Sequence, residues 1–362
     1  MVLRALVVST WGNFRIYGAA YYSYVGHRSR VKCRSSSMAL MHILNSDGEH
    51  DARALIILPH TLLEQDDIGG DLLNQQVIDY STAANRIVER AREAVGAWLK
   101  NGDCEIPGDV VDRLDFAVVP AVMSVTKEVG GSRIRLRFGE DPNLYQLAVY
   151  YHVYNALIKG NYTEVYLDIT HGINYMPHLA SEAVRLAAYV YAVRNRKSVS
   201  LVTVNSDPYS VSRSQSPGSR QQVDEASREV PDLTIHRTYD EKVIRWNAPN
   251  VVGTLALGAL EWYARVNISY KDLYDNEKWQ DMPISMRAET LLLSRLTQDE
   301  RDALKLGLVV SASLRDSLYP VLLSLKDEIE KYRTALTTDL ENLAKTPMGV
   351  ERRGNQLIIR HT

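Results

Sequence analysis

The chemically most varied stretch of this sequence is Thr163–Pro177, TEVYLDITHGINYMP. Its first part, Glu164–Leu167, has the apolar, β-prone composition of a buried strand. The loop that follows combines a carboxylate, a hydroxyl, an imidazole, a glycine and an amide, from Asp168, Thr170, His171, Gly172 and Asn174. Hydroxyls and backbone N–H groups bind phosphate oxygens, and an imidazole donates to phosphate or transfers protons near neutral pH. The alternative is that Asp168 and Asn174 only cap the turn and the next helix.

A second polar turn follows the first predicted strand, Leu3–Ser9. Its side chains are those of Ser9, Thr10, Trp11, Gly12 and Asn13. We expect both strands to be parallel, so that both turns lie at carboxyl ends, where open α/β sheets bind their ligands. Together the two turns are suited to a nucleotide with phosphates, and Trp11 is suited to stack on a base. A tryptophan in the core or at a dimer contact is an equally good interpretation of Trp11.

The elements that position these turns alternate between strands and helices. The strands are predicted at Leu3–Ser9, Arg53–Pro59, Leu114–Val125, Glu164–Leu167 and Ser198–Asn205. The helices are predicted at Met38–Leu44, Asp79–Lys100, Asn143–Lys159 and Met176–Arg194. This order predicts an α/β fold with a Rossmann-like, doubly wound and mainly parallel sheet over residues 1–205.

Two further regions have a different pattern. Ser124–Phe138 is predicted to form a hairpin whose Arg133, Arg135 and Arg137 share one face, as a solvated surface or as a contact to phosphate or to a second subunit. The serine-rich segment Ser206–Arg228 begins a connecting segment over residues 206–248. Residues 249–362 are predicted to form a mostly helical second domain, with a short terminal strand at Asn355–His361.

Composition narrows the classes of function. The chain has 362 residues and a net charge of −2, so any contact with nucleic acid must come from local patches. The two cysteines, Cys33 and Cys104, indicate neither a metal site nor a disulfide framework, which favours a reducing, cytoplasmic setting. There is no GxGxxG, no P-loop and no long apolar run, so we expect no dinucleotide cofactor and no membrane span. No carboxylate-rich cluster suggests a magnesium site, and a zinc site would need more ligands, so we also expect no bound metal.

The motifs STWGN after the first strand and LDITHGINYMP after the fourth resemble those of the CARF–HEPN proteins of type III CRISPR systems. The resemblance implies a CARF domain that dimerises and binds cyclic oligoadenylate, usually the tetra-adenylate, and a HEPN domain that cleaves RNA without metal. A two-fold symmetric ring fits a site built from two subunits. The matching positions imply a pocket lined by Ser9, Thr10, Trp11, Gly12, Asn13, Asp168, Thr170, His171, Gly172 and Asn174.

The helical region departs from the family pattern. HEPN ribonucleases that resemble this chain carry an Arg separated from a His by four to six residues. The best match here is Leu314–Pro320, in which Arg315 fits but Pro320 stands where the His belongs. Because proline cannot transfer a proton, either the ribonuclease site is inactive or Tyr319 or His361 replaces the histidine.

Four hypotheses follow. The first is a cyclic-oligoadenylate sensor with a degenerate HEPN domain. The second is a ring nuclease, in which Thr10 orients the bound ring and His171 assists attack by its 2′-OH. The third is a single-strand endoribonuclease that uses Arg315 in a shifted catalytic set. The fourth is an adaptor that docks other effectors and has no activity of its own.

Overall fold

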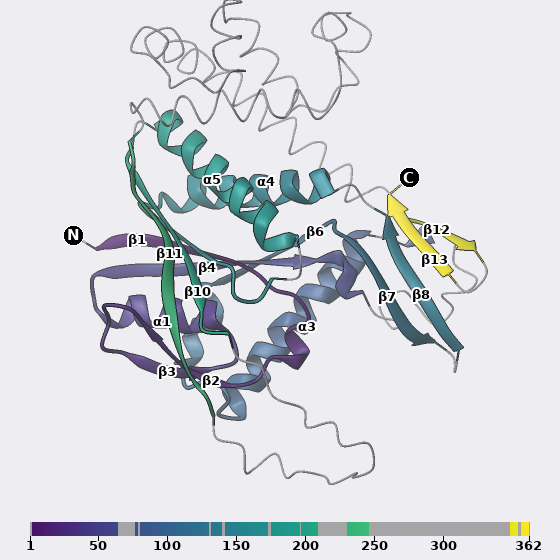
Figure 1. Cartoon of the computed structure of the whole chain (residues 1–362), viewed down its shortest axis with the longest axis horizontal. Helices are drawn as coiled ribbons and strands as arrows, with labels where there is room; N and C mark the ends of the chain where they lie inside the picture. The colour runs from purple at the N-terminus through teal and green to yellow at the C-terminus, as the bar shows by residue number, and fades with distance from the viewer. Residues whose placement is uncertain are drawn as a thin grey trace, which may run out of the picture.

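The architecture is described from a computed structural model of the chain (Figure 1). The structure describes residues 2–63, 77–78, 80–129, 132–139, 142–172, 175–195, 197–208, 230–245, 348–353 and 356–361. The helices predicted beyond residue 249, with Arg315 and Pro320, lie outside the described residues, as do residues 209–229 of the predicted connecting segment 206–248.

An eight-stranded sheet in the order β3-β2-β11-β10-β9-β1-β4-β6 forms the centre of the fold. Its strands are β1 (Leu3–Thr10), β2 (Ala20–Tyr24), β3 (Arg30–Cys33), β4 (His50–Pro59), β6 (Leu114–Val119), β9 (Glu164–Asp168), β10 (Val199–Ser206) and β11 (Asp232–Ile244). All neighbours are parallel except the pairs β2–β3 and β10–β11. The predicted α/β fold with a mainly parallel sheet is confirmed for this part of the chain.

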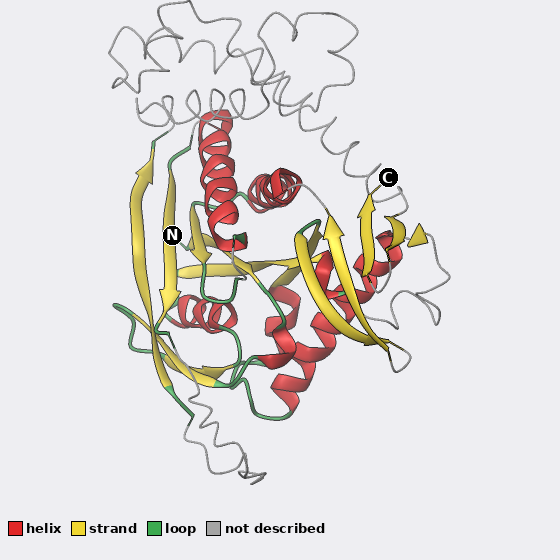
Figure 2. Cartoon of the chain, turned by 45° about the vertical axis from the view of Figure 1, so that its right-hand side comes forward, coloured by secondary structure: helices red, strands yellow, loops and turns green. Residues whose placement is uncertain are grey.

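Helices cover both faces of this sheet. Helices α1 (Ser36–Ser46) and α3 (Tyr80–Lys100) lie on one face, and α4 (Pro142–Gly160) and α5 (Met176–Asn195) lie on the other (Figures 1 and 2). In β4, Ile56 belongs to the first core and Ile57 to the second, which explains the unbroken apolar run Ala54–Leu58 in this strand. No helix in the described part of the chain has the length and apolar character needed to cross a membrane.

The central sheet extends beyond residue 205, the end of the first predicted domain. Strand β11 lies inside the predicted connecting segment, yet it pairs with β10 and, on its other side, with β2. The hairpin of β2 and β3, which the sequence analysis left unassigned, forms the sheet edge beyond β11. Apolar and polar residues alternate in these strands, and in β11 the apolar positions Leu233 and Ile235 are buried. Because the alternate positions are polar, the strands could not be recognised in a region rich in charged residues.

A second sheet, in the order β5-β12-β13-β8-β7, stands beside the first (Figures 1 and 2). It contains β5 (Val77–Ile78), β7 (Val122–Val129), β8 (Ser132–Gly139), β12 (Met348–Arg353) and β13 (Gln356–His361). The predicted strand Leu114–Val125 is therefore two strands in different sheets, separated at Pro120, which has no N–H for a ladder. The terminal strand predicted at Asn355–His361 corresponds to β13, and it pairs with β8.

The inference that the two cysteines form no disulfide is also wrong. Cys33, at the end of β3, is bonded to Cys104, which lies 71 residues further on in the segment after α3. Sequence spacing could not reveal this pair, because the hairpin and the long helix bring the two residues together only in the folded chain. The argument from free thiols for a reducing compartment therefore no longer holds.

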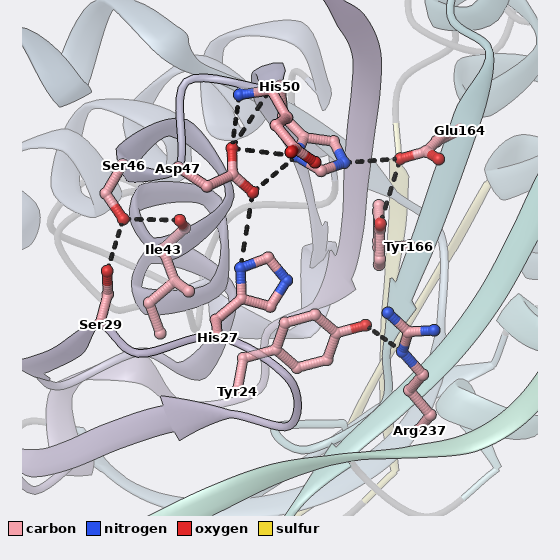
Figure 3. Close-up of polar contacts among 11 residues, drawn as sticks. Tyr24, His27, Ser29, Ile43, Ser46, Asp47, His50, Glu164, Tyr166 and Arg237 are labelled. Atoms are coloured by element: carbon pink, nitrogen blue, oxygen red, sulfur yellow. Dashed lines mark hydrogen bonds and ion pairs between the residues drawn. The ribbon is translucent and has the colours of Figure 1, made fainter.

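A network of polar side chains joins the amino-terminal ends of the central strands (Figure 3). His50, the first residue of β4, lies between two carboxylates: its Nδ1 is 3.0 Å from Asp47 and its Nε2 is 3.1 Å from Glu164 of β9. Tyr166 donates to the same Glu164, and His27 lies 3.5 Å from Asp47. The network connects the carboxyl end of α1 to β4 and β9, at the edge of the sheet opposite the predicted ligand turns.

Candidate functional site

The two polar turns of the sequence analysis meet at the carboxyl edge of the eight-stranded sheet. Strands β1 and β9 are parallel neighbours, and Ser9 is in register with Asp168. The amino terminus of α1 reaches the same edge, where Ser35 caps the helix by accepting from the N–H of Met38. The two turns therefore lie together, as the parallel arrangement of the strands predicted, and the amino terminus of α1 is a third segment at this place.

Asp168 is the buried centre of this site. The hydroxyl of Ser36, in the first turn of α1, donates to Asp168 Oδ2 at 2.6 Å, and Ser9 donates to the same oxygen at 3.5 Å. The N–H of Thr170 donates to Oδ1 at 3.0 Å. The side chain is only 1% exposed, and its negative charge lies near a helix amino terminus, where the helix dipole favours it. Asp168 thus fixes the loop that follows β9, here called the key loop, against β1 and α1.

His171 has a defined orientation and protonation state. The backbone N–H of Ser36 donates to His171 Nε2 at 3.1 Å, so this nitrogen is unprotonated and the neutral ring carries its proton on Nδ1. Its ring stacks on Tyr17 at a centroid distance of 4.2 Å. Burial lowers the pKa of His171, and the nearby Asp168 charge opposes that shift only in part. The hydroxyl of Tyr17 donates to the His171 carbonyl and accepts from the Gly12 N–H.

The protonation state of His171 predicts that acid destabilises this loop. Because burial lowers its pKa in the folded protein below the ordinary value of 6.5, the unfolded chain binds more protons in the window just below pH 6.5. The free energy of unfolding should therefore fall as the pH falls through this window. Urea unfolding at pH 7.5, 6.5 and 5.5 measures the effect. His42 and His152 also have lowered pKa values, so His171→Gln, which keeps an acceptor for Ser36, is the reference. Equal pH dependence in both proteins would contradict the prediction.

Thr10 and Gly172 approach each other closely across the two turns. A Cβ placed on Gly172 would lie 2.7 Å from Thr10 Oγ1 and 2.0 Å from Cγ of Pro177, so only glycine fits here. The Thr10 side chain is fully buried, and its hydroxyl has no hydrogen-bond partner among the residues that the structure describes. The loop after β9 therefore covers Thr10.

Trp11 lies in the core and presents no face to a base. Its side chain is fully buried and contacts the rings of Phe14, Trp98 and Phe116, and its Nε1 donates to Ser37. The prediction that Trp11 stacks on a base does not fit this placement, whereas the alternative of a core tryptophan does. From the sequence alone, a tryptophan directly after a strand fits a core position and a base-stacking position equally well.

Some of the remaining predicted residues lie at this site, and others lie elsewhere or outside the described residues. Asn13 is exposed, and Thr170, His171 and Gly172 are half-buried at the same edge. Asn174 lies outside the described residues, as do Arg315 and Tyr319. His361 ends β13 in the five-stranded sheet and is not part of this site. No group of three His, Cys, Asp or Glu side chains suited to a metal ion occurs in the described ranges.

The sequence analysis missed a pair of titratable residues at the same edge. His236 Nε2 lies 2.7 Å from Asp207 Oδ1, and the two side chains are 50% and 42% exposed. Asp207 also accepts from the N–H of Thr234, and this bond together with His236 lowers its pKa. The pair is adjacent to the key loop, because Thr170 Oγ1 accepts from the N–H of Ser206. The alternation of apolar residues in β11 was the signal that could have located His236.

Comparison with known proteins shows which family the chain belongs to. Residues 6–208, which span both polar turns, match the family described as the CARF domain of CRISPR system endoribonuclease Csx1. The CRISPR system endoribonuclease Csx1 of Methanocaldococcus jannaschii is 26% identical over 209 residues, which are 57% of this chain. The alignment spans 37% of the length of that relative. Because the match covers more than half of the sequence, the chain belongs to the Csx1 CARF family of CRISPR-associated proteins.

Proposed function

We propose that this chain is a sensor of CRISPR defence that binds cyclic oligoadenylate, with the tetra-adenylate as its ring, at the carboxyl edge of β1 and β9. The observation that carries the proposal is the buried Asp168, which joins both CARF motifs to the start of α1 through Ser9, Thr170 and Ser36. Such a fixed framework presents its outer polar groups without a large cost of ordering on binding.

The groups available to a ligand are polar and largely uncharged. Asn13 offers an amide and Thr170 a hydroxyl, while His171 is neutral. Backbone N–H groups and neutral donors bind phosphates when they are held in place. One chain supplies these groups from one side, so we propose that a second copy supplies the other half of a two-fold pocket for the symmetric ring.

We propose that binding is the main activity and that the ribonuclease motif is degenerate. Pro320 stands where the motif needs a proton-transferring His. His361 belongs to β13 and is far from Arg315 in the sequence. The chain therefore acts as a sensor whose helical region, if it cleaves RNA, uses another proton donor.

A second candidate function is cleavage of the ring in the same pocket. The exposed Asp207–His236 pair favours it, because an imidazole held by a carboxylate is a general base for the ring's 2′-OH. In this candidate His236 takes the role that the sequence analysis gave to His171, whose Nε2 is occupied by the Ser36 N–H. Thr10 does not contact the ring in this candidate, because the loop covers it.

The test is incubation of the purified protein with radiolabelled cyclic tetra-adenylate without metal. A parallel incubation contains labelled single-stranded RNA, with and without unlabelled ring. Mobility shift measures binding, and a denaturing gel resolves products. We expect a shifted ring and intact RNA. Linear di-adenylate would favour the second candidate, ring-dependent RNA cleavage would show an active ribonuclease, and absence of binding would overturn the proposal.

A further inference from the structure

The disulfide between Cys33 and Cys104 is anchored just before the helix that contacts the candidate site. Cys33 is the last residue of β3, and the chain enters α1 at Ser36. The backbone N–H of Ser36 donates to His171, and its hydroxyl donates to Asp168. The disulfide therefore holds the strand that leads directly into the residue joining both parts of the site.

A second connection runs from the disulfide to the site through Arg34. Its backbone N–H donates to the Cys104 sulfur at 3.3 Å. Its guanidinium approaches Asp103 Oδ2 with two nitrogens, Nε at 3.0 Å and Nη2 at 2.9 Å. The remaining nitrogen, Nη1, donates to the carbonyl of Tyr17 at 2.8 Å. Arg34 therefore joins Tyr17 to the segment that carries Cys104.

Tyr17 holds the two polar turns together. Its hydroxyl accepts from the Gly12 N–H at 3.0 Å and donates to the His171 carbonyl at 3.3 Å, and its ring stacks on the imidazole. Its ring also lies 6.4 Å from that of Trp98, whose carbonyl accepts from the N–H of Cys104. The position of Tyr17 between the turns therefore depends on the segment that carries Cys104.

We propose that the Cys33–Cys104 disulfide is a redox switch that sets the affinity of the site for cyclic oligoadenylate. This switch rests on the proposed ring binding, whose site it regulates. In the oxidised form the disulfide holds β3 against the segment after α3, so Arg34 and Tyr17 are in place before the ring binds. Groups that are already in place cost less to order on binding. Reduction releases the segment, and the ring then binds more weakly because Tyr17 must be ordered again.

A dithiol reductant is the reaction partner of the disulfide. Cys33 is fully buried and Cys104 is 3% exposed, but Cys104 lies in a surface segment in which Gly102 and Glu105 are exposed. Opening of this segment gives a thiolate of the reductant access to the Cys104 sulfur, and its attack breaks the disulfide, with Cys33 leaving as a thiolate. The second thiol of the reductant then displaces Cys104 from the mixed disulfide. Two electrons and two protons pass to the cysteines, and the reductant becomes a disulfide.

Hydrogen exchange tests the switch without any ligand. The full chain, oxidised or reduced with excess dithiothreitol, is transferred to heavy water, and mass spectrometry follows peptides over residues 10–17. The N–H of Gly12 is bonded to Tyr17 and to the His171 carbonyl. We expect its exchange to become roughly tenfold faster on reduction, since local opening controls exchange there.

Three variants show that the disulfide acts through Arg34. Cys33→Ser combined with Cys104→Ser should exchange at the fast rate with or without dithiothreitol. Arg34→Gln keeps the disulfide and should exchange at the fast rate even when oxidised. The matched control is Arg113→Gln, which removes an ion pair with Asp51 elsewhere and should leave exchange of these peptides unchanged. If the double serine variant does not fold, the reduced unmodified protein takes its place.

Ring affinity is the second readout, measured by anisotropy with fluorescent cyclic tetra-adenylate. We expect reduction to weaken binding roughly tenfold, within the usual range of coupling between two sites. Because such coupling is reciprocal, saturating ring should make the disulfide harder to reduce by the same factor. In dithiothreitol redox buffers this lowers the midpoint potential by about 30 mV, the equivalent of a tenfold change for two electrons.

Other results would overturn the switch. Equal ring affinity in the two redox states would do so whatever the exchange shows. A disulfide that persists in excess dithiothreitol, measured by thiol labelling, would be a permanent link and no switch. If the ring binds in neither state while exchange still depends on reduction, the ring proposal is wrong, and the redox control of the two turns remains.

Discussion

Replacing Trp11 with alanine is expected to lower the free energy of unfolding by about 3–5 kcal/mol, the usual cost of removing a large buried aromatic side chain. Trp11 is fully buried, with the rings of Phe14, Trp98 and Phe116 around it. The neighbouring rings belong to several elements, so the cavity cannot close by movement of one of them. Urea unfolding followed by circular dichroism measures the loss.

The control for this prediction is Trp11→Phe. Phenylalanine keeps most of the buried ring and loses the hydrogen bond from Nε1 to Ser37, whose hydroxyl retains its bond with Ser35. A loss of about 1 kcal/mol is expected from that bond, with a smaller cavity than in the alanine variant. If Trp11→Ala unfolds like the unmodified protein and fails to bind cyclic tetra-adenylate, base stacking is the correct role and the core assignment is wrong.

The parallel strands of the fold could be predicted because they are buried on both faces. Strands β1 and β4 contain the unbroken apolar runs Ala5–Val8 and Ala54–Leu58, and the helices have clear periodicity. Strands β2 and β11 were missed because their polar positions alternate with buried residues such as Tyr22 and Ile235. The sequence also gave no sign that the C-terminal strand β13 pairs with β8.

The site was predicted where it depends on one chain segment and missed where it depends on long-range contacts. Both polar turns are located correctly, because the carboxyl ends of parallel strands meet at one edge. The hydrogen bond from Ser36 to Asp168 joins residues 132 positions apart, and the Asp207–His236 pair joins two strands across a segment of low hydrophobicity. Such contacts are set by strand order and register, which no local pattern contains.

Replacing His236 with alanine is expected to slow conversion of cyclic tetra-adenylate to linear di-adenylate by roughly 10²–10⁴-fold, the usual contribution of a general acid or base. The prediction belongs to the second candidate function. Binding of the intact ring should change little, because the groups proposed to hold it are on the turns after β1 and β9. Single-turnover cleavage of labelled ring, with the protein in excess, separates the rate from the affinity.

Two variants show whether His236 acts as a base or only supports β11. Hydrogen bonds from the Thr234 N–H and from His236 lower the pKa of Asp207, so Asp207 remains a carboxylate at neutral pH and orients the imidazole. Asp207→Asn should therefore reduce the rate and shift its pH profile, which loss of a purely structural contact would not do. His178→Ala removes another exposed imidazole beside a carboxylate, Glu182, and should leave the rate unchanged. If His236→Ala cleaves the ring normally, the pair is not the base and the case for a sensor without ring cleavage becomes stronger.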